Sequence, residues 1–183
     1  MKGSEVKTSG PNRTQSKPHW RNLTPNSIDS LMRVANTVHP DLPENREVFA
    51  QRIDVFPEGC LGLTDSDSGE LCGYVISHPI QHRQPPALNS LLRECSLSTD
   101  QYYIHDLAIL PKYRGLGLAE ECLNRIFLIA DGFPTTSLIS VYGTSLFWGR
   151  YGFVPLDTDG SLKSKLIDYG DEAIYLERDN KSS

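Results

Sequence analysis

The sequence has no long apolar stretch, no paired cysteine motif and no surplus of positive charge. No run approaches the 18 apolar residues that a membrane-spanning helix needs, so we expect no membrane span. The first residues contain no apolar core of the kind found in secretory signals, so we do not expect secretion. The net charge of −5 argues against a general nucleic-acid-binding protein, which usually carries a basic face.

The sequence also has few of the residue patterns that are typical of disulfides or metal sites. None of the four cysteines has a CxxC neighbour, so we expect reduced thiols and a cytoplasmic or nuclear location. They are Cys60, Cys72, Cys95 and Cys122. His78 and His82 have the four-residue spacing of a helical metal site, but Pro79 between them disfavours a regular helix. We therefore expect no metal cofactor.

The composition is that of a single globular domain. Hydrophobic residues make up 38% of the 183 residues and charged residues 22%, which leaves enough apolar material for a core. Residues 1–18 are polar and nearly free of large apolar side chains, so we expect a disordered tail there. Residues 19–183 should form one domain.

Hydrophobic spacing predicts an alternation of helices and strands. Apolar residues at helical spacing predict two helices between Ser27, a candidate N-cap, and Phe56. Alternating and buried-type runs predict strands in the segments 20–25, 60–64, 71–78, 101–110, 136–143, 152–156 and 171–178. A helix of about 16 residues should follow residue 117, a short one should cover 144–151, and 79–100 should be a loop with one short helix. This order predicts an α+β fold around one mixed sheet.

The most informative segment joins a predicted strand to a predicted helix. It reads Arg114-Gly115-Leu116-Gly117-Leu118-Ala119. A helix start leaves unpaired N–H groups and a positive dipole end, which suit a phosphate group. Glycines permit close approach of the backbone, and an arginine adds a planar cation. The segment therefore predicts a pyrophosphate site.

Glycines at a helix start also occur in other phosphate-binding motifs, and at helix starts that bind no ligand. The P-loop motif GxxxxGK[ST] is absent from the sequence. The dinucleotide fingerprint GxGxxG/A fails because Glu120 stands at its last position, which makes a nicotinamide-dependent oxidoreductase a weak third choice. A glycine-rich helix start without any ligand is the structural alternative.

The same segment resembles the GNAT superfamily of acyl-CoA N-acyltransferases. Arg114, Gly117 and Ala119 match the family pattern of arginine or glutamine, two residues, glycine, one residue, and glycine or alanine. The preceding "HDLAILPKYRG" and the later "SLFWGRYGFVP" also resemble family segments. The resemblance covers residues 20–178 and implies a GNAT-like, mostly antiparallel mixed sheet flanked by helices.

The resemblance also implies how acetyl-CoA would bind as co-substrate. Backbone N–H groups of the glycine turn would hold the pyrophosphate, the preceding strand would pair with the pantetheine, and the late helix would line the other side. The residues implied are Leu107, Ala108, Ile109, Arg114, Gly115, Leu116, Gly117, Leu118, Ala119, Phe147 and Trp148.

His105 is the candidate general base that would deprotonate the amine, because histidine has a suitable intrinsic pKa. It also resembles a proton-relay histidine of arylalkylamine N-acetyltransferases. Regular alternation would place Tyr103, His105, Leu107 and Ile109 on one face, and Asp106 on the other in a structural role. Tyr103 is a second catalytic candidate, although tyrosine is a poor base. A hydrogen-bonded core histidine is an equal alternative for His105.

The acid that would protonate the departing thiolate is not evident. Many relatives have a tyrosine four residues before a Gly-Phe pair, where this sequence has Trp148. Either another group protonates sulfur, with Tyr142 and Ser145 as the candidates, or no acid is needed. We expect an N-acetyltransferase that acts by direct attack in a ternary complex, as a monomer or homodimer. Its acceptor should be a small amine or, as second choice, a peptide or protein amine. The rival hypothesis is a non-catalytic acyl-CoA-binding module.

Overall fold

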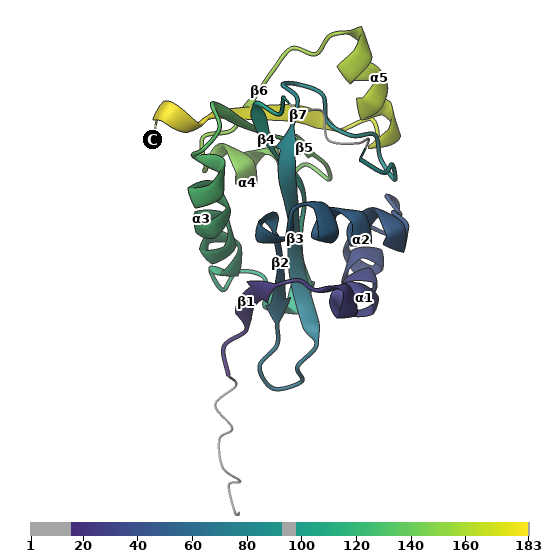
Figure 1. Ribbon diagram of the computed structural model, residues 1–183, viewed down its shortest axis with the longest axis vertical. Helices are drawn as coiled ribbons and strands as arrows, with labels where there is room; N and C mark the ends of the chain where they lie inside the picture. The colour runs from purple at the N-terminus through teal and green to yellow at the C-terminus, as the bar shows by residue number, and fades with distance from the viewer. Residues whose placement is uncertain (1–15, 93–97, 183) are drawn as a thin grey trace, which may run out of the picture.

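Residues 16–92 and 98–182 are described by a computed structural model, and within them one seven-stranded sheet runs in the order β1-β2-β3-β4-β5-β7-β6 (Figure 1). The strands are β1 (His19–Asn22), β2 (Cys60–Thr64), β3 (Leu71–Ile80), β4 (Gln101–Ile109), β5 (Thr135–Ser140), β6 (Val154–Pro155) and β7 (Ile174–Asp179). Only β4 and β5 pair in parallel; the other neighbouring strands of this sheet are antiparallel. The expected α+β class with a mostly antiparallel mixed sheet is confirmed.

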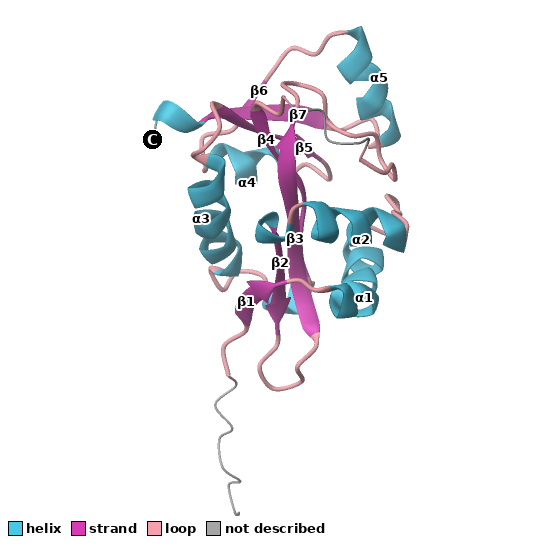
Figure 2. Ribbon diagram, in the orientation of Figure 1, coloured by secondary structure: helices cyan, strands magenta, loops and turns pink. Residues whose placement is uncertain are grey.

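Helices cover both faces of the sheet (Figure 2). They are α1 (Ile28–Val38), α2 (Arg46–Val55), α3 (Leu118–Ala130), α4 (Ser145–Gly149) and α5 (Gly160–Asp168). Helices α1 and α2 lie on one face, which we call the α1–α2 face, and α3 packs on the opposite one, the α3 face.

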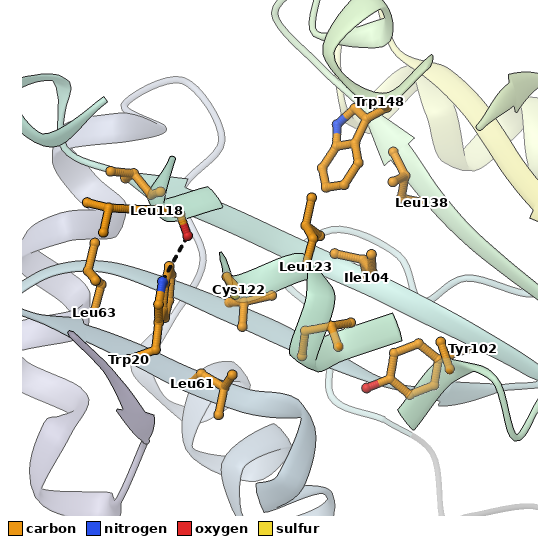
Figure 3. Close-up of a cluster of buried hydrophobic side chains, with 14 of the residues drawn as sticks. Trp20, Leu61, Leu63, Tyr102, Ile104, Leu118, Cys122, Leu123, Leu138 and Trp148 are labelled. Carbon is orange, nitrogen blue, oxygen red and sulfur yellow. Dashed lines mark hydrogen bonds between the residues drawn. The ribbon is translucent and has the colours of Figure 1, made fainter. Parts of the chain in front are cut away.

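Each face has its own apolar core. On the α1–α2 face, α1 buries its stripe of Ile28, Leu31, Val34 and Ala35 against β3. On the α3 face, the packed side chains come from β1 to β5, β7, α3 and α4, and Figure 3 shows most of them. The indole Nε1 of Trp20 in β1 donates to the carbonyl of Leu118, 2.9 Å away, which fixes the edge strand to the first residue of α3.

The structure corrects two of the predicted elements. Helix α5 was missed because it is short and buries only Leu162, so its apolar periodicity is weak; the side chain of Asp159 accepts from the Leu162 N–H as its N-cap. Ser27 does not cap α1 through its side chain, because it ends a 3₁₀ turn (Pro25–Ser27) that enters the helix.

The loop before β4 forms a strap against α5 and α2. The carbonyl of Pro85 accepts from the Lys165 ammonium at 2.8 Å, and the carbonyl of Ser90 accepts from Arg52 at 3.2 Å. The described parts of this loop, 81–92 and 98–100, contain no helix. Residues 93–97, with Cys95, lie outside the described residues.

The structure bears only in part on the expectations for the N-terminal tail, the cysteines and a membrane span. Most of the expected tail, residues 1–15, lies outside the described residues, and residues 16–18 have no regular structure. Cys60, Cys72 and Cys122 are free and buried. Within the described part of the chain, no helix is long and apolar enough to span a membrane.

Candidate active site

The site begins where two parallel strands part. β4 and β5 pair only over Tyr102–Ile104 and Thr136–Leu138, although β4 continues to Ile109 and β5 to Ser140. Beyond Ile104 the edge of β4 that faces β5 has no strand partner among the described residues. A cavity of about 760 Å³ occupies this opening and reaches from the glycine turn to residues of the α1–α2 face.

The glycine turn forms one end of the cavity. Gly115 and Gly117 have φ values of +76° and +74°, which side chains rarely tolerate, and both residues line the cavity. A Cβ added to Gly117 would meet no atom within 4 Å, so its glycine is required by backbone conformation. Because the first helical bond joins the Glu121 N–H to the Gly117 carbonyl, the N–H groups before it are available to a ligand.

Three contacts hold this turn in place. The Nε of Arg114 donates to the Ile109 carbonyl at 2.8 Å, which closes the turn onto the end of β4. The Tyr113 hydroxyl donates to Asp65 at the tip of the β2–β3 hairpin, and Trp20 holds the carbonyl of Leu118. The turn is therefore fixed before any ligand binds.

The opposite wall comes from α4. Phe147 and Trp148 line the cavity and pack edge to face, with ring centroids 5.0 Å apart. Trp148 is only 7% exposed and also packs on Phe153. Its indole is thus part of the apolar wall. Of the other residues implied at the coenzyme, Leu116 is exposed outside the cavity, and the side chain of Ala108 packs on the α1–α2 face.

A β-bulge reorganises the centre of β4. Ile76 pairs with Asp106 but the next residue, Ser77, pairs with Ile104, so His105 is an extra residue in the ladder. The predicted alternation is therefore wrong. His105 and Asp106 both face α1 and α2, whereas Leu107 and Ile109 pack on the α3 face.

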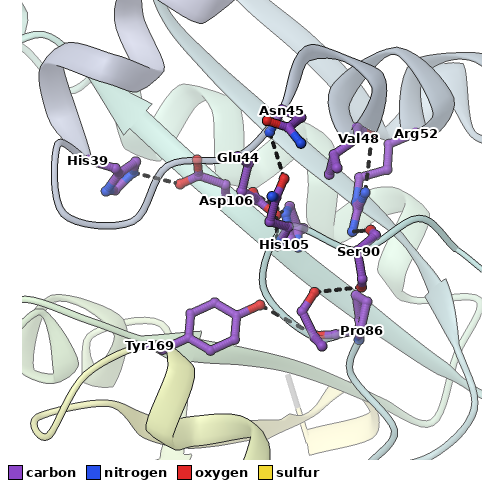
Figure 4. Close-up of polar contacts among 12 residues, drawn as sticks. His39, Glu44, Asn45, Val48, Arg52, Pro86, Ser90, His105, Asp106 and Tyr169 are labelled. Carbon is purple, nitrogen blue, oxygen red and sulfur yellow. Dashed lines mark hydrogen bonds and ion pairs between the residues drawn. The ribbon is translucent and has the colours of Figure 1, made fainter.

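His105 forms a buried pair with a carboxylate that the sequence did not indicate. Its Nε2 lies 2.8 Å from Oε2 of Glu44, in the segment between α1 and α2, and the two side chains are 1% and 6% exposed (Figure 4). The backbone N–H of Asn89 donates to the other Glu44 oxygen at 2.9 Å. Burial alone would raise the pKa of Glu44, but the charge of His105 and its hydrogen bond outweigh it and lower that pKa.

Asp106 forms a second pair, with His39 at the end of α1. Nε2 of His39 lies 2.9 Å from one Asp106 oxygen, and the Tyr74 hydroxyl donates to the other. Asp106 thus holds the end of α1, a structural role of the kind expected, but from the same face as His105. Burial lowers the pKa of His39, but the charge of Asp106 and its hydrogen bond raise it further, so the net shift is upward. Burial would raise the pKa of Asp106, but the charge of His39 and the hydrogen bonds from His39 and Tyr74 lower it overall.

The predicted catalytic tyrosines are separated by the structure. Tyr142 lines the cavity and stacks on His39, with ring centroids 5.7 Å apart and an interplanar angle of 9°. Tyr103 is fully buried behind His105, and burial raises its pKa well above the usual value. This position does not support Tyr103 as a catalytic side chain.

Sequence reasoning missed His39, Glu44 and the buried Arg52. Arg52 donates to the carbonyls of Val48 and Ser90, and its charge also favours the ionised form of Glu44. A proline after His39 and one before Glu44 were the available signs that this segment leaves the helices. Among residues 16–92 and 98–182, no group of three or more potential ligands is placed to hold a metal ion.

Comparison with known proteins gives the family and the fold. A family model described as acetyltransferase (GNAT) family matches residues 27–137. No curated protein has a significantly similar sequence. The loading GNATL domain of CurA from Lyngbya majuscula superposes with a TM-score of 0.72 at 12% identity, over 92% of this chain and 100% of that one.

Two further structures with the same fold were solved with coenzyme A derivatives. Naa50 of Arabidopsis thaliana, in complex with the bisubstrate analogue CoA-Ac-MVNAL, has a TM-score of 0.64 at 18% identity, over 88% of this chain and 97% of that one. The GphF GNAT-like decarboxylase in complex with isobutyryl-CoA has a TM-score of 0.67 at 14% identity, over 88% and 99%. At these identities the likeness establishes the fold alone.

Proposed function

The chain belongs to the acetyltransferase (GNAT) family, and we propose on that premise that it transfers an acetyl group from acetyl-CoA to a primary amine. The transfer takes place by direct attack within a ternary complex. One observation carries the proposal: a single cavity joins the glycine turn to the His105–Glu44 pair through the opening between β4 and β5.

The turn and the free edge of β4 are suited to bind the co-substrate. Backbone N–H groups from Gly115 to Ala119 hold the pyrophosphate at the positive end of α3. The unpaired edge of β4 at Leu107–Ile109 bonds the pantetheine as an added strand would. This places the thioester in the opening, between the two faces of the sheet.

On the α1–α2 face, His105 receives the proton of the amine. Glu44 accepts from Nε2–H and so fixes the tautomer, which leaves the Nδ1 lone pair available. Nδ1 of His105 has no hydrogen-bond partner in the part of the chain that the structure describes. Because the side chain is 1% exposed, the proton reaches it through one bound water. The acceptor amine therefore enters from the α1–α2 face, opposite the coenzyme.

The acceptor is a small amine or, as second choice, the amine of a peptide. Naa50, whose complex contains a bisubstrate analogue with the peptide MVNAL, supports the second choice. The described cavity wall on the acceptor side combines apolar Val38, Leu42 and Leu88 with the aromatic rings of Tyr142 and Tyr169. This wall favours an amine attached to an apolar or aromatic group.

A non-catalytic acyl-CoA-binding module is the second candidate. The observation that favours it is Trp148, which fills the apolar wall where many relatives have a tyrosine acid. Such a module needs the glycine turn but not the two histidine–carboxylate pairs. The two candidates therefore differ in the effect of substitutions at His105.

The first test is calorimetric titration of acetyl-CoA into the wild type and Gly117→Glu. The glutamate places a negative charge where the pyrophosphate would lie, so we expect binding to be abolished. Gly69→Glu is the matched control, because Gly69 has a φ of +73° and equally open surroundings but lies at the hairpin tip, outside the cavity. Both variants carry the same backbone strain of about 1 kcal/mol.

Release of the coenzyme thiol in the presence of an amine panel separates the two candidates. Transfer to a primary amine that disappears in His105→Gln supports the acetyltransferase. Binding of acetyl-CoA without transfer to any amine supports the module. A folded wild type that does not bind acetyl-CoA contradicts both.

A further inference from the structure

The proposed reaction releases a thiolate, and Trp148 does not supply a group that would protonate it. An indole N–H is not an acid at neutral pH. Burial raises the pKa values of Tyr142, Tyr151 and Tyr169, all of which line the cavity, so each is a weaker acid than a thiol with a pKa of about 8.5. Arginine side chains also line the cavity, but a guanidinium is not deprotonated in proteins and so is no acid.

His39 is placed where the two strands have separated. Its partner Asp106 is the second residue of β4 beyond Ile104, the last one paired with β5. The imidazole stacks on Tyr142, which follows the end of β5 by two residues and has a left-handed φ of +53°. His39, Asp106 and Tyr142 all line the cavity. The imidazole of His39 therefore lies in the part of the cavity where β4 and β5 are no longer paired with each other.

One nitrogen of His39 is unused. Nε2 bonds Asp106, whereas Nδ1 is buried and has no hydrogen-bond partner among the described residues. A buried polar atom without a partner is rare and costs free energy unless a ligand completes it. The arrangement thus leaves one N–H of the imidazolium without a protein partner in the described part of the chain, at the edge of the cavity that His39 lines.

The surrounding charges favour a protonated His39. The groups that face it are Asp106 from β4, Glu44 from the α1–α2 segment, Arg114 before α3, Tyr142 after β5 and the Tyr74–Asp106 hydrogen bond from β3. The two carboxylates, Asp106 and Glu44, raise the His39 pKa by more than the Arg114 guanidinium lowers it. Burial opposes the charge, but the net direction of the His39 pKa is upward.

We propose that His39, held by Asp106, is the general acid that protonates the coenzyme A thiolate. The inference rests on the proposed acetyl transfer. The ammonium form of the acceptor loses two protons and forms the C–N bond, while the C–S bond breaks. His39 gives one proton from Nδ1 to sulfur and regains one of those released by nitrogen, and the other passes through His105 to solvent. The products are the amide and the free thiol.

The test compares pH profiles of kcat for the wild type and His39→Gln. The glutamine amide retains an N–H for Asp106 but has no titrating proton. We expect kcat at pH 7 to fall about 100-fold, in the usual range for loss of a proton-transfer group, with KM for acetyl-CoA nearly unchanged. The alkaline decline of the wild-type profile should be absent from the variant. His19→Gln, an exposed histidine on β1 outside the cavity, is the control and should behave as wild type.

Asp106→Asn provides an independent readout, because it keeps the shape of the pair but removes the charge that retains the proton. The alkaline decline of kcat should move to lower pH. An unshifted decline in Asp106→Asn, or a His39→Gln enzyme within about threefold of wild type, would overturn the acid role. A wild type that binds acetyl-CoA but transfers no acetyl group overturns the proposed function, and the acid role with it.

Discussion

The cavity contains two histidine–carboxylate pairs, and β4 supplies the histidine in one and the carboxylate in the other. In one, β4 supplies the imidazole of His105 and the α1–α2 segment supplies the carboxylate of Glu44. In the other, β4 supplies the carboxylate of Asp106 and the end of α1 supplies the imidazole of His39. Each imidazole bonds its partner through Nε2 and leaves Nδ1 unpaired within the described residues.

The pairs differ in their access to water. The side chains of His105 and Glu44 are 1% and 6% exposed, whereas those of His39 and Asp106 are 15% and 16% exposed. A deeply buried pair is fixed in geometry and costs much to break. A partly exposed pair exchanges protons with solvent more readily. This difference suits the first pair to a fixed geometry around the proposed base and the second to proton exchange during turnover.

The largest effect should come from His105→Gln, because it removes the proposed base. The amide keeps a donor for Glu44, so the buried carboxylate retains its partner. We expect kcat to fall about 1,000-fold, within the range for loss of a general base, while acetyl-CoA binding is unchanged. Steady-state kinetics and calorimetry on one preparation check both parts. Equal loss of binding and rate would instead indicate a structural histidine.

Removal of the buried carboxylate should cost more stability than removal of an exposed one. Glu44→Ala leaves the enclosed His105 and Arg52 without their anion, so the free energy of unfolding should fall by about 3 kcal/mol. Asp29→Ala is the control. The side chains of Asp29 and its ion-pair partner Arg46 are 75% and 57% exposed, and such exposed pairs contribute about 0.5 kcal/mol or less. Urea unfolding of both variants makes the comparison, and equal losses would contradict it.

The partly exposed pair should stabilise the fold only within a window of pH. The folded pKa of His39 is raised, so its contribution is complete below its unfolded value of about 6.5 and is lost as pH rises through the folded value. The folded pKa of Asp106 is lowered, so its contribution is complete above about 3.9 and is lost as pH falls through the folded value. The difference in unfolding free energy between wild type and His39→Gln should therefore be largest between these limits. A difference that is constant from about pH 3 to about pH 9 would contradict the charged pair.

The smallest effect on the wild type should come from Trp148→Tyr. This change restores the hydroxyl that many relatives have, at a cost of about 1 kcal/mol for the lost packing on Phe153. If His39 is the acid, kcat of the wild type changes less than about threefold. The same change in a His39→Gln background should recover part of the lost rate. If Trp148→Tyr raises kcat neither in the wild type nor in His39→Gln, Trp148 has a packing role only.

The sequence predicted the parts of the site that depend on local structure. The glycine turn needs two left-handed residues at a helix start, and Gly115 and Gly117 are visible as such without any tertiary information. The order of strands followed from apolar alternation, and only α5, which buries a single side chain, was lost. These features are determined by residues that are near one another in the chain.

The two pairs could not be predicted in the same way. His39 and Asp106 are 67 residues apart, and Glu44 and His105 are 61 apart, so their meeting depends on how α1 and the segment after it pack on the sheet. The bulge was also invisible, because "YYIHDLAI" is apolar on both sides of its His-Asp pair, and a strand that is buried on both faces has no polar alternation to reveal an extra residue. The assumption of unbroken alternation therefore placed Leu107, Ile109 and Asp106 on the wrong faces.

That extra residue reverses the parity of β4. Before it, even-numbered residues such as Tyr102 and Ile104 point to the α3 face; after it, odd-numbered residues such as Leu107 and Ile109 do. A regular strand never presents an imidazole and a carboxylate from consecutive positions on one side, and here both ends of the proposed chemistry depend on that irregularity. Deleting His105 would leave Ile104 next to Asp106, so the ladder with Ser77 and Ile76 would become regular and the later residues of β4 would keep their present faces. The strand would then retain the carboxylate and lose the imidazole, because only the extra residue lets both face α1 and α2.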